Sequence, residues 1–196
     1  MRLLQTIVCS LALAWAVPSL STGGPAPATV SAALAEKQAV ASTRLRVWGF
    51  EVYDARLWAR TGFELTRFEQ QPFALELAYL RSFKGADIAR RSVDEMRQTG
   101  ALDEADATRW LAAMSALFPD VQRGDRITGV HVPGTGARFY LNDRLLGEVG
   151  EDRFSRRFFG IWLSERTSQP RMREALLAQL QAQGNGNGTA PGAVNR

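Results

Sequence analysis

Hydrophobic and polar residues alternate in several short stretches of the chain, and this pattern predicts strands. Ile127, Gly129 and His131 occupy alternate positions of one stretch, as expected for a strand with one buried face. That stretch ends at the turn sequence of residues 133–136. The same period of two runs through residues 73–80, directly after a proline. These segments predict a sheet whose strands are joined by tight turns.

Residues 44–59 form the longest stretch of this kind, and the sequence favours either a strand pair or one long bent strand. Trp48 and Phe50 would share one face of it. Gly49, between them, indicates a bulge or a close approach of the backbone. Residues 61–71 follow as a polar loop.

A period of three to four residues predicts helices in the rest of the chain. Residues 85–98 carry a hydrophobic stripe of Ala89, Val93 and Met96, and Gly100 ends the helix.

Three more helices follow. The first begins after Asp103, a good N-cap, and stops at Pro119. The second carries Phe154 and Phe158 on one face, and the third begins near Ser168. Because strands and helices do not alternate regularly, the order predicts an α+β fold rather than a doubly wound α/β fold.

The two ends of the chain differ from the middle in composition. Residues 1–35 hold one positive charge, a short apolar run and small residues before Glu36, a pattern typical of an export signal. Residues 184–196 are rich in glycine and asparagine and lack apolar periodicity, which predicts a flexible tail. The expected organisation is a signal peptide at 1–35, one domain at 36–183 and a tail at 184–196. The protein is therefore expected to be exported to a bacterial periplasm, with an uncleaved N-terminal anchor as the alternative.

Charge and rare residues exclude several classes of function. The 196 residues carry a net charge of +4, but the arginines are interleaved with acidic residues, which argues against nucleic acid as a partner. The only cysteine, Cys9, lies in the expected signal, so no disulfide, thiol nucleophile or cysteine metal site is expected in the mature chain. His131 is the only histidine and has no recognisable catalytic or metal-binding partners, so a structural role is favoured. No nucleotide-binding motif is present, and no cofactor is expected.

Several motifs, in their order, resemble the chalcone isomerase-like proteins of bacteria. They are Val47–Leu57 (VWGFEVYDARL), the GD-x-I and PG-x-G turns after residue 123, and the F-x-x-x-F-F-x-I-W-L helix with the proline-capped helix behind it. The resemblance covers about residues 44–180. It implies an open antiparallel sheet with helices packed on one face and a cleft between them.

The resemblance also tests for catalysis. Plant-type chalcone isomerases hold the substrate's anionic oxygen with an arginine of an early strand and organise a water molecule with a threonine and a tyrosine. Arg44 or Arg46 lies where that arginine is expected, but Tyr53 stands at the threonine position. The segment FKGADIARRS, where the tyrosine would lie, contains none. The catalytic set is therefore incomplete, and we assign no catalytic residue.

The resulting hypothesis is an exported, non-catalytic protein that binds a small apolar or amphipathic anion such as a fatty acid. The candidate ligand-binding residues are Arg44, Arg46, Trp48, Phe50, Tyr53, Trp58 and Tyr79. For each aromatic residue, a plain core position is the competing interpretation.

Two other functions stay open. One is an isomerase acting on an enone substrate, in which Tyr53 or Tyr79 replaces the missing groups. The other is a module that binds a partner or a membrane surface through the helix at residues 153–162, with Arg156, Arg157 and Phe159 exposed. The ligand and the oligomeric state are not specified by the sequence.

Overall fold

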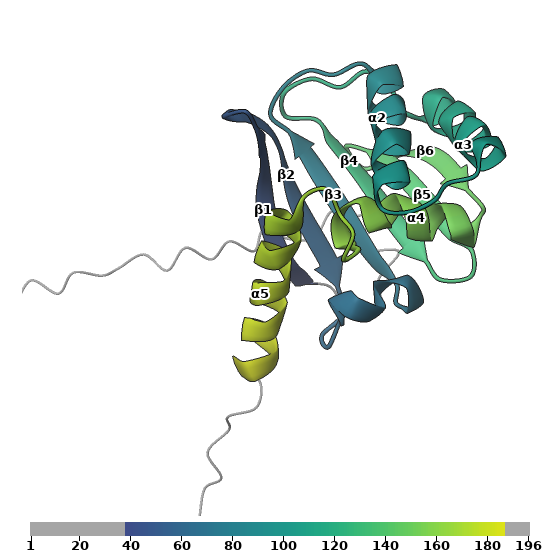
Figure 1. Cartoon of the computed structure of the whole chain (residues 1–196). Coiled ribbons are helices and arrows are strands. Elements are labelled where there is room, and N and C mark those ends of the chain that lie inside the picture. The colour runs from purple at the N-terminus through teal and green to yellow at the C-terminus, as the bar shows by residue number, and fades with distance from the viewer. Residues whose placement is uncertain (1–37, 187–196) are drawn as a thin grey trace, which may run out of the picture.

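Six antiparallel strands form one open sheet in which each strand pairs with the next along the chain (Figure 1). The structure is a computed structural model and describes residues 38–186. The strands are β1 (Gln38–Val47), β2 (Phe50–Ala59), β3 (Phe73–Tyr79), β4 (Arg126–Val132), β5 (Gly136–Leu141) and β6 (Arg144–Val149). The helices are η1 (Leu65–Gln70), α2 (Gly85–Gln98), α3 (Glu104–Leu117), α4 (Asp152–Leu163) and α5 (Pro170–Gly186). The predicted α+β class is confirmed.

Several predicted boundaries change. Residues 44–59 form a hairpin rather than one bent strand, and β1 already begins at Gln38. The polar loop at 61–71 contains the short helix η1, which buries Leu65 and Phe68. Helix α5 continues to Gly186, three residues into the predicted tail. The expected signal peptide and the rest of the tail lie outside the described residues.

Two tight turns contain residues with positive φ. Trp48 and Gly49 join β1 to β2 with φ of 48° and 82°, and Asn142 and Asp143 join β5 to β6 with φ of 46° and 73°. Positive φ at both central residues is typical of the type I′ turn, whose twist matches that of a β-hairpin. Asn and Asp accept this conformation readily, whereas a bulky residue such as Trp rarely does.

The helices cover one face of the sheet, and the N-cap of α3 is the one predicted. Asp103 Oδ1 accepts a hydrogen bond of 2.7 Å from the Ala105 backbone amide at the start of α3, as predicted. Helix α5 packs along β1, the edge strand (Figure 1). Gln179 of α5 donates to the Ser42 carbonyl (2.7 Å) and accepts from the Ser42 amide (3.0 Å). These bonds satisfy edge groups that would otherwise be open to pairing with another strand.

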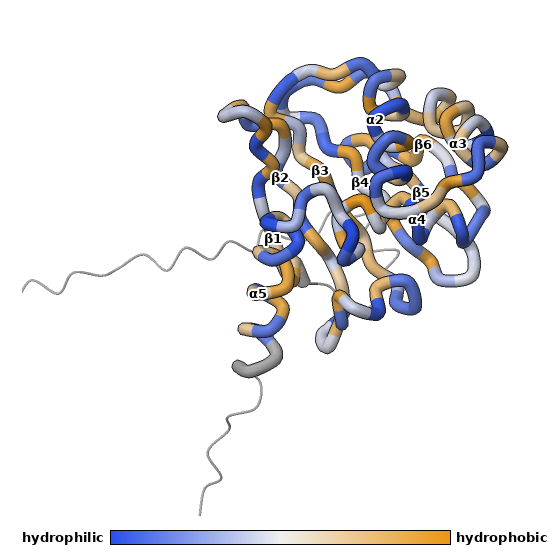
Figure 2. The backbone as a smooth tube through the Cα atoms, viewed as in Figure 1, coloured by the Kyte–Doolittle hydropathy of each residue, from blue (hydrophilic) through white to orange (hydrophobic). Residues whose placement is uncertain are grey.

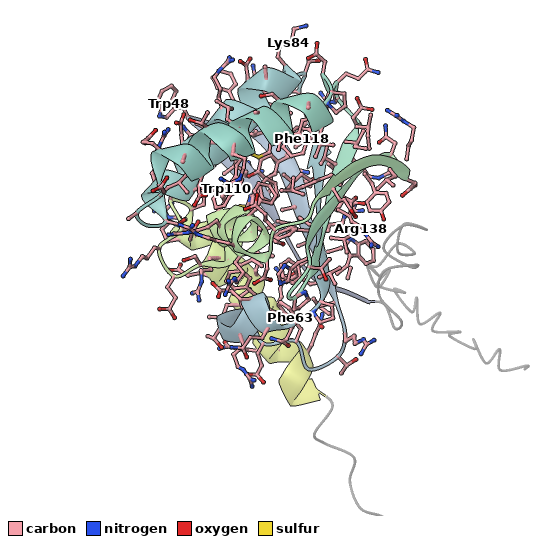
Figure 3. The ribbon with its side chains drawn as sticks, turned by 90° about the vertical axis from the view of Figure 1, so that its right-hand side faces the viewer. Trp48, Phe63, Lys84, Trp110, Phe118 and Arg138 are labelled. Carbon is pink, nitrogen blue, oxygen red and sulfur yellow. The ribbon has the colours of Figure 1, made fainter. Side chains whose placement is uncertain are left out.

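The core between the sheet and the helices is mainly aromatic. Phe139 of β5 and Phe159 of α4 are fully buried. The Phe159 ring packs against Phe73, and the Phe139 ring packs against both Phe118 and Phe158, with ring centroids 4.9–5.1 Å apart. Figure 3 shows Trp110 and Phe118 in this layer.

The opposite face of the sheet carries charges and one small apolar cluster. Arg56 and Arg126 both lie 3.5 Å from the carboxylate of Glu76. Trp58, Ala74 and Val130 form a cluster separate from the main core. The alternation that separates these two faces is visible along the strands in Figure 2. Among residues 38–186, no helix combines the length and hydrophobicity needed to cross a bilayer.

Candidate ligand-binding site

A cavity of about 710 Å³ lies between the sheet and the helices at the β1–β2 hairpin end of the molecule. Its volume is within the range typical of small-molecule sites, roughly 300–1,000 Å³. Its walls come mainly from strands β1–β4 and helices α2 and α4. Mainly apolar side chains line it: Leu45, Val47, Trp48, Phe50, Val52, Leu77, Phe83, Ile88, Phe118, Ile127, Phe158 and Ile161.

The sheet wall of the cavity depends on an irregularity in β2. Leu45 pairs with Tyr53, but the next pair is Arg46 with Glu51, so Val52 is an extra residue. A β-bulge of this kind changes which side chains share a face. As a result, the neighbours Val52 and Tyr53 both line the cavity, which a regular strand would not allow.

Two tyrosines place polar groups in this apolar wall. Trp162 Nε1 donates a hydrogen bond of 2.8 Å to the Tyr53 hydroxyl, and the Tyr53 and Tyr79 rings meet edge to face at 6.1 Å. Burial raises the pKa of both phenols above the usual range, so both stay protonated at neutral pH. Within the described residues, the Tyr79 hydroxyl has no hydrogen-bond partner, which leaves it available to a ligand.

The charged groups of the lining lie on α2 and just before it. Arg91 forms an ion pair with Glu95, and Ser168 donates a hydrogen bond of 2.5 Å to the same carboxylate. Arg81 instead lies over the Phe50 ring, with its guanidinium carbon 4.9 Å from the ring centroid. Within the described part of the chain, Arg81 lacks a carboxylate partner. It is therefore the cation of the lining that is free to meet an anionic ligand.

The residues proposed from the sequence divide into two groups. Trp48, Phe50, Tyr53 and Tyr79 line the cavity, whereas Trp58 lies on the opposite face of the sheet in the cluster with Ala74 and Val130.

Arg44 and Arg46 also lie outside the cavity lining. Arg44 donates two hydrogen bonds to the Asp54 carboxylate (2.5 and 2.9 Å) and one to Glu51 (2.7 Å). Arg46 donates one to Glu51 at 3.0 Å. These bonds raise the pKa of Arg44 and lower that of Glu51. The hairpin turn is the reason: because residues 47 and 50 pair on the cavity side, residues 46 and 51 must point to the other side.

The sequence reasoning overlooked Arg81 and Arg91. Arg91 shares a helix face with Ile88, Ser92 and Glu95, at the spacing i, i+3, i+4 and i+7. That spacing could have been recognised in the sequence. Arg81 follows β3 directly, and no periodic signal marks its position.

The helix proposed as a docking surface does not present the expected side chains. Phe159 of α4 is fully buried, so the prediction of its exposure is wrong. Arg156 pairs with Asp152 at 3.0 Å, and Arg157 donates to the Ala101 carbonyl at 2.5 Å. Both arginines thus form contacts within the protein.

His131 has the environment of a structural residue. It is fully buried, with Nδ1 2.6 Å from Ser155 Oγ and Nε2 3.1 Å from the Glu69 carbonyl. Burial lowers its pKa. A neutral ring that donates from Nε2 and accepts at Nδ1 satisfies both contacts. The described residues contain no cluster of three or more His, Cys, Asp or Glu side chains suited to a metal ion.

Comparisons with known proteins agree with this architecture. An uncharacterized protein of Haemophilus influenzae is 29% identical over 136 residues, which are 69% of this chain and 65% of that protein. The crystal structure of an Arabidopsis thaliana fatty-acid binding protein superimposes with a TM-score of 0.58 at 12% identity, covering 76% of this chain and 90% of that one. The family model of chalcone isomerase-like proteins matches residues 40–178. The chain therefore belongs to the chalcone isomerase-like family.

Proposed function

We propose that this protein binds an amphipathic anion with a long apolar chain, such as a fatty acid, without transforming it. The observation that carries the proposal is the cavity, which combines apolar walls with a cation at its rim, Arg81, that has no carboxylate partner among residues 38–186. An apolar chain gains free energy by leaving water in such a space, and a guanidinium favours a carboxylate. The name of the Arabidopsis structural neighbour supports the same class of ligand.

The polar groups of the cavity suit binding better than acid–base catalysis. Tyr53 and Tyr79 are protonated at neutral pH, as phenols ordinarily are, and burial raises their pKa further, so they can donate hydrogen bonds but are poor general bases. The isomerase alternative stays a prediction. Turnover of a chalcone above the uncatalysed rate by the purified protein would favour it over simple binding.

A cavity-filling variant tests the binding proposal. Ile88 of α2 lines the cavity, and Ile88→Trp would place a bulkier ring in the path of a ligand chain, whereas Ile88→Leu keeps the volume of the side chain. Native mass spectrometry of protein purified without detergent should detect a bound lipid in the wild type and in Ile88→Leu but not in Ile88→Trp. Calorimetric titration with a fatty acid should give the same order. A wild type that carries no lipid and binds no added fatty acid would contradict the proposal.

We also propose that the protein acts outside the cytoplasm, after removal of residues 1–35. The support is the sequence pattern of that segment, in which an apolar run precedes small residues. Mass spectrometry of the protein recovered from periplasmic extract measures its N-terminus. A mature chain that begins near Glu36 is expected, and an intact N-terminus at Met1 would contradict the cleavage.

A further inference from the structure

The tip of the β1–β2 hairpin exposes three large hydrophobic side chains. Trp48 is 95% exposed, Phe50 60% and Val47 40%, and all three also belong to the cavity lining. Figure 3 shows Trp48 at the margin of the molecule, on the side of the sheet that carries the helices. The exposed tip is therefore continuous with the apolar wall of the cavity.

The residue at the centre of this tip is unusual for its backbone conformation. Trp48 has φ of 48°, in a region that bulky side chains rarely adopt. The equivalent turn between β5 and β6 uses Asn142 and Asp143, which tolerate positive φ. Because Trp48 is 95% exposed, almost all of its ring is left free for an external contact.

The tip is flanked by arginines, two of them ion-paired with carboxylates and one, Arg81, without a carboxylate partner among the described residues. Arg44, Arg46 and Arg81 lie beside it, against two carboxylates, Glu51 and Asp54. The Arg46 side chain is 62% exposed. A small apolar tip with flanking arginines is complementary to a bilayer surface that carries anionic headgroups.

Two features favour a bilayer over a protein partner. Three side chains cannot supply the roughly 800 Å² per partner that a stable protein interface buries. Tryptophan, moreover, prefers the boundary between headgroups and acyl chains because its ring is both apolar and polar.

We propose that the tip formed by Val47, Trp48 and Phe50 inserts into the headgroup region of an anionic lipid bilayer. This orientation places the cavity rim against the membrane, so that an amphipathic lipid can pass between bilayer and cavity without crossing water. The transfer of cargo rests on the proposed function, whereas the docking of the tip does not.

Substitution of Trp48 by asparagine provides the test. Trp48→Asn creates an Asn-Gly turn, which is the preferred sequence for a type I′ hairpin, so the fold should be kept and thermal unfolding should occur no lower than in the wild type. Leu145→Asn is the matched control, because Leu145 is 56% exposed on β6, at the other edge of the sheet. Flotation with vesicles of phosphatidylcholine, with and without phosphatidylglycerol, measures docking.

The wild type and Leu145→Asn should float with vesicles that contain phosphatidylglycerol, and Trp48→Asn should lose most of the bound fraction. Flotation should decline as salt is added, because salt screens the arginines. Three results would each overturn the proposal: no flotation of the wild type, equal flotation of Trp48→Asn, or equal flotation on pure phosphatidylcholine.

Fluorescence locates the contact. Trp15 lies in the expected signal peptide, and Trp58, Trp110 and Trp162 are at most 5% exposed. In the mature chain, the difference between the wild type and Trp48→Asn therefore isolates the emission of Trp48. Vesicles should shift this emission to shorter wavelength, and lipids brominated near the headgroup should quench it. An unshifted and unquenched emission would contradict insertion of the tip.

The cavity variant separates docking from cargo binding. Ile88→Trp should float like the wild type although it carries no lipid. A wild type that floats with an empty cavity would support docking while the proposed function fails. A wild type that binds fatty acid in solution but does not float would show the reverse.

Discussion

Replacing Arg81 by glutamine should weaken the binding of a long-chain carboxylate and leave the binding of the alcohol of equal chain length unchanged. Arg81 lies over the Phe50 ring at the rim of the cavity and has no carboxylate partner among the described residues. Its substitution therefore breaks no ion pair within the protein, and any loss of affinity reports on the ligand.

The expected magnitude follows from the exposure of the rim. A hydrogen bond to a charged group contributes about 1.5–3 kcal/mol when it is shielded from water, but ion pairs open to solvent contribute at most about 1 kcal/mol. Arg81 is exposed, so we expect a loss of about 1 kcal/mol, or a roughly fivefold rise in Kd. The alcohol also corrects for the contact between Arg81 and Phe50, which is lost with either ligand.

Calorimetric titration at low and at moderate salt measures the effect. The matched control is Arg46→Gln, because Arg46 lies at the same end of the sheet but pairs with Glu51 on the opposite face. This variant should bind both ligands like the wild type. A loss of carboxylate binding in Arg46→Gln but not in Arg81→Gln would place the anion on the other face and refute the assignment. An equal loss for acid and alcohol in Arg81→Gln would show that the arginine shapes the cavity rather than holding the charge.

Three more predictions concern the cavity and the core. Lengthening a bound fatty acid by two methylene groups should tighten binding by about 1.6 kcal/mol, or roughly 15-fold, until the cavity is full; a series of chain lengths measured by calorimetry would contradict the apolar cavity if affinity did not rise. The pKa of His131 is lowered in the folded state by burial, so its contribution to stability is complete above the unfolded pKa of about 6.5 and is lost as the pH falls below it. Urea unfolding between pH 8 and 5 should show this loss in the wild type and a flatter dependence in His131→Asn; parallel curves would contradict it. Gly129→Ala should destabilise the protein by about 1–3 kcal/mol, because a Cβ there would lie 3.0 Å from the Phe159 ring; an unchanged denaturation midpoint would refute the close contact.

The sequence alone determined those elements whose causes are local. Helix α2 spans the predicted residues 85–98, with Ala89, Val93 and Met96 buried as the period required. Asp103 caps α3 through its own side chain. Caps and hydrophobic periods act within a few residues, so they can be recognised without the rest of the fold.

The face on which Arg46 lies could not be predicted from the local sequence. The resemblance to chalcone isomerases led to the expectation that Arg44 or Arg46 holds an anion in the cleft, but position along a strand does not say which face a side chain occupies. In the structure Leu45 and Val47 line the cavity, so Arg46 between them lies on the outer face, where it pairs with Glu51.

Only the tertiary structure decided which arginine lies at the cavity rim without an ion-pair partner among the described residues. Arg81 reaches the rim because it directly follows β3, which pairs with β2 of the hairpin. His131 is likewise buried because η1 and α4, distant in the chain, supply Glu69 and Ser155. Periodicity shows which residues of a strand share a face, but not which face lies against the ligand. Strand pairing and helix packing decide that, and both depend on contacts between residues far apart in the chain.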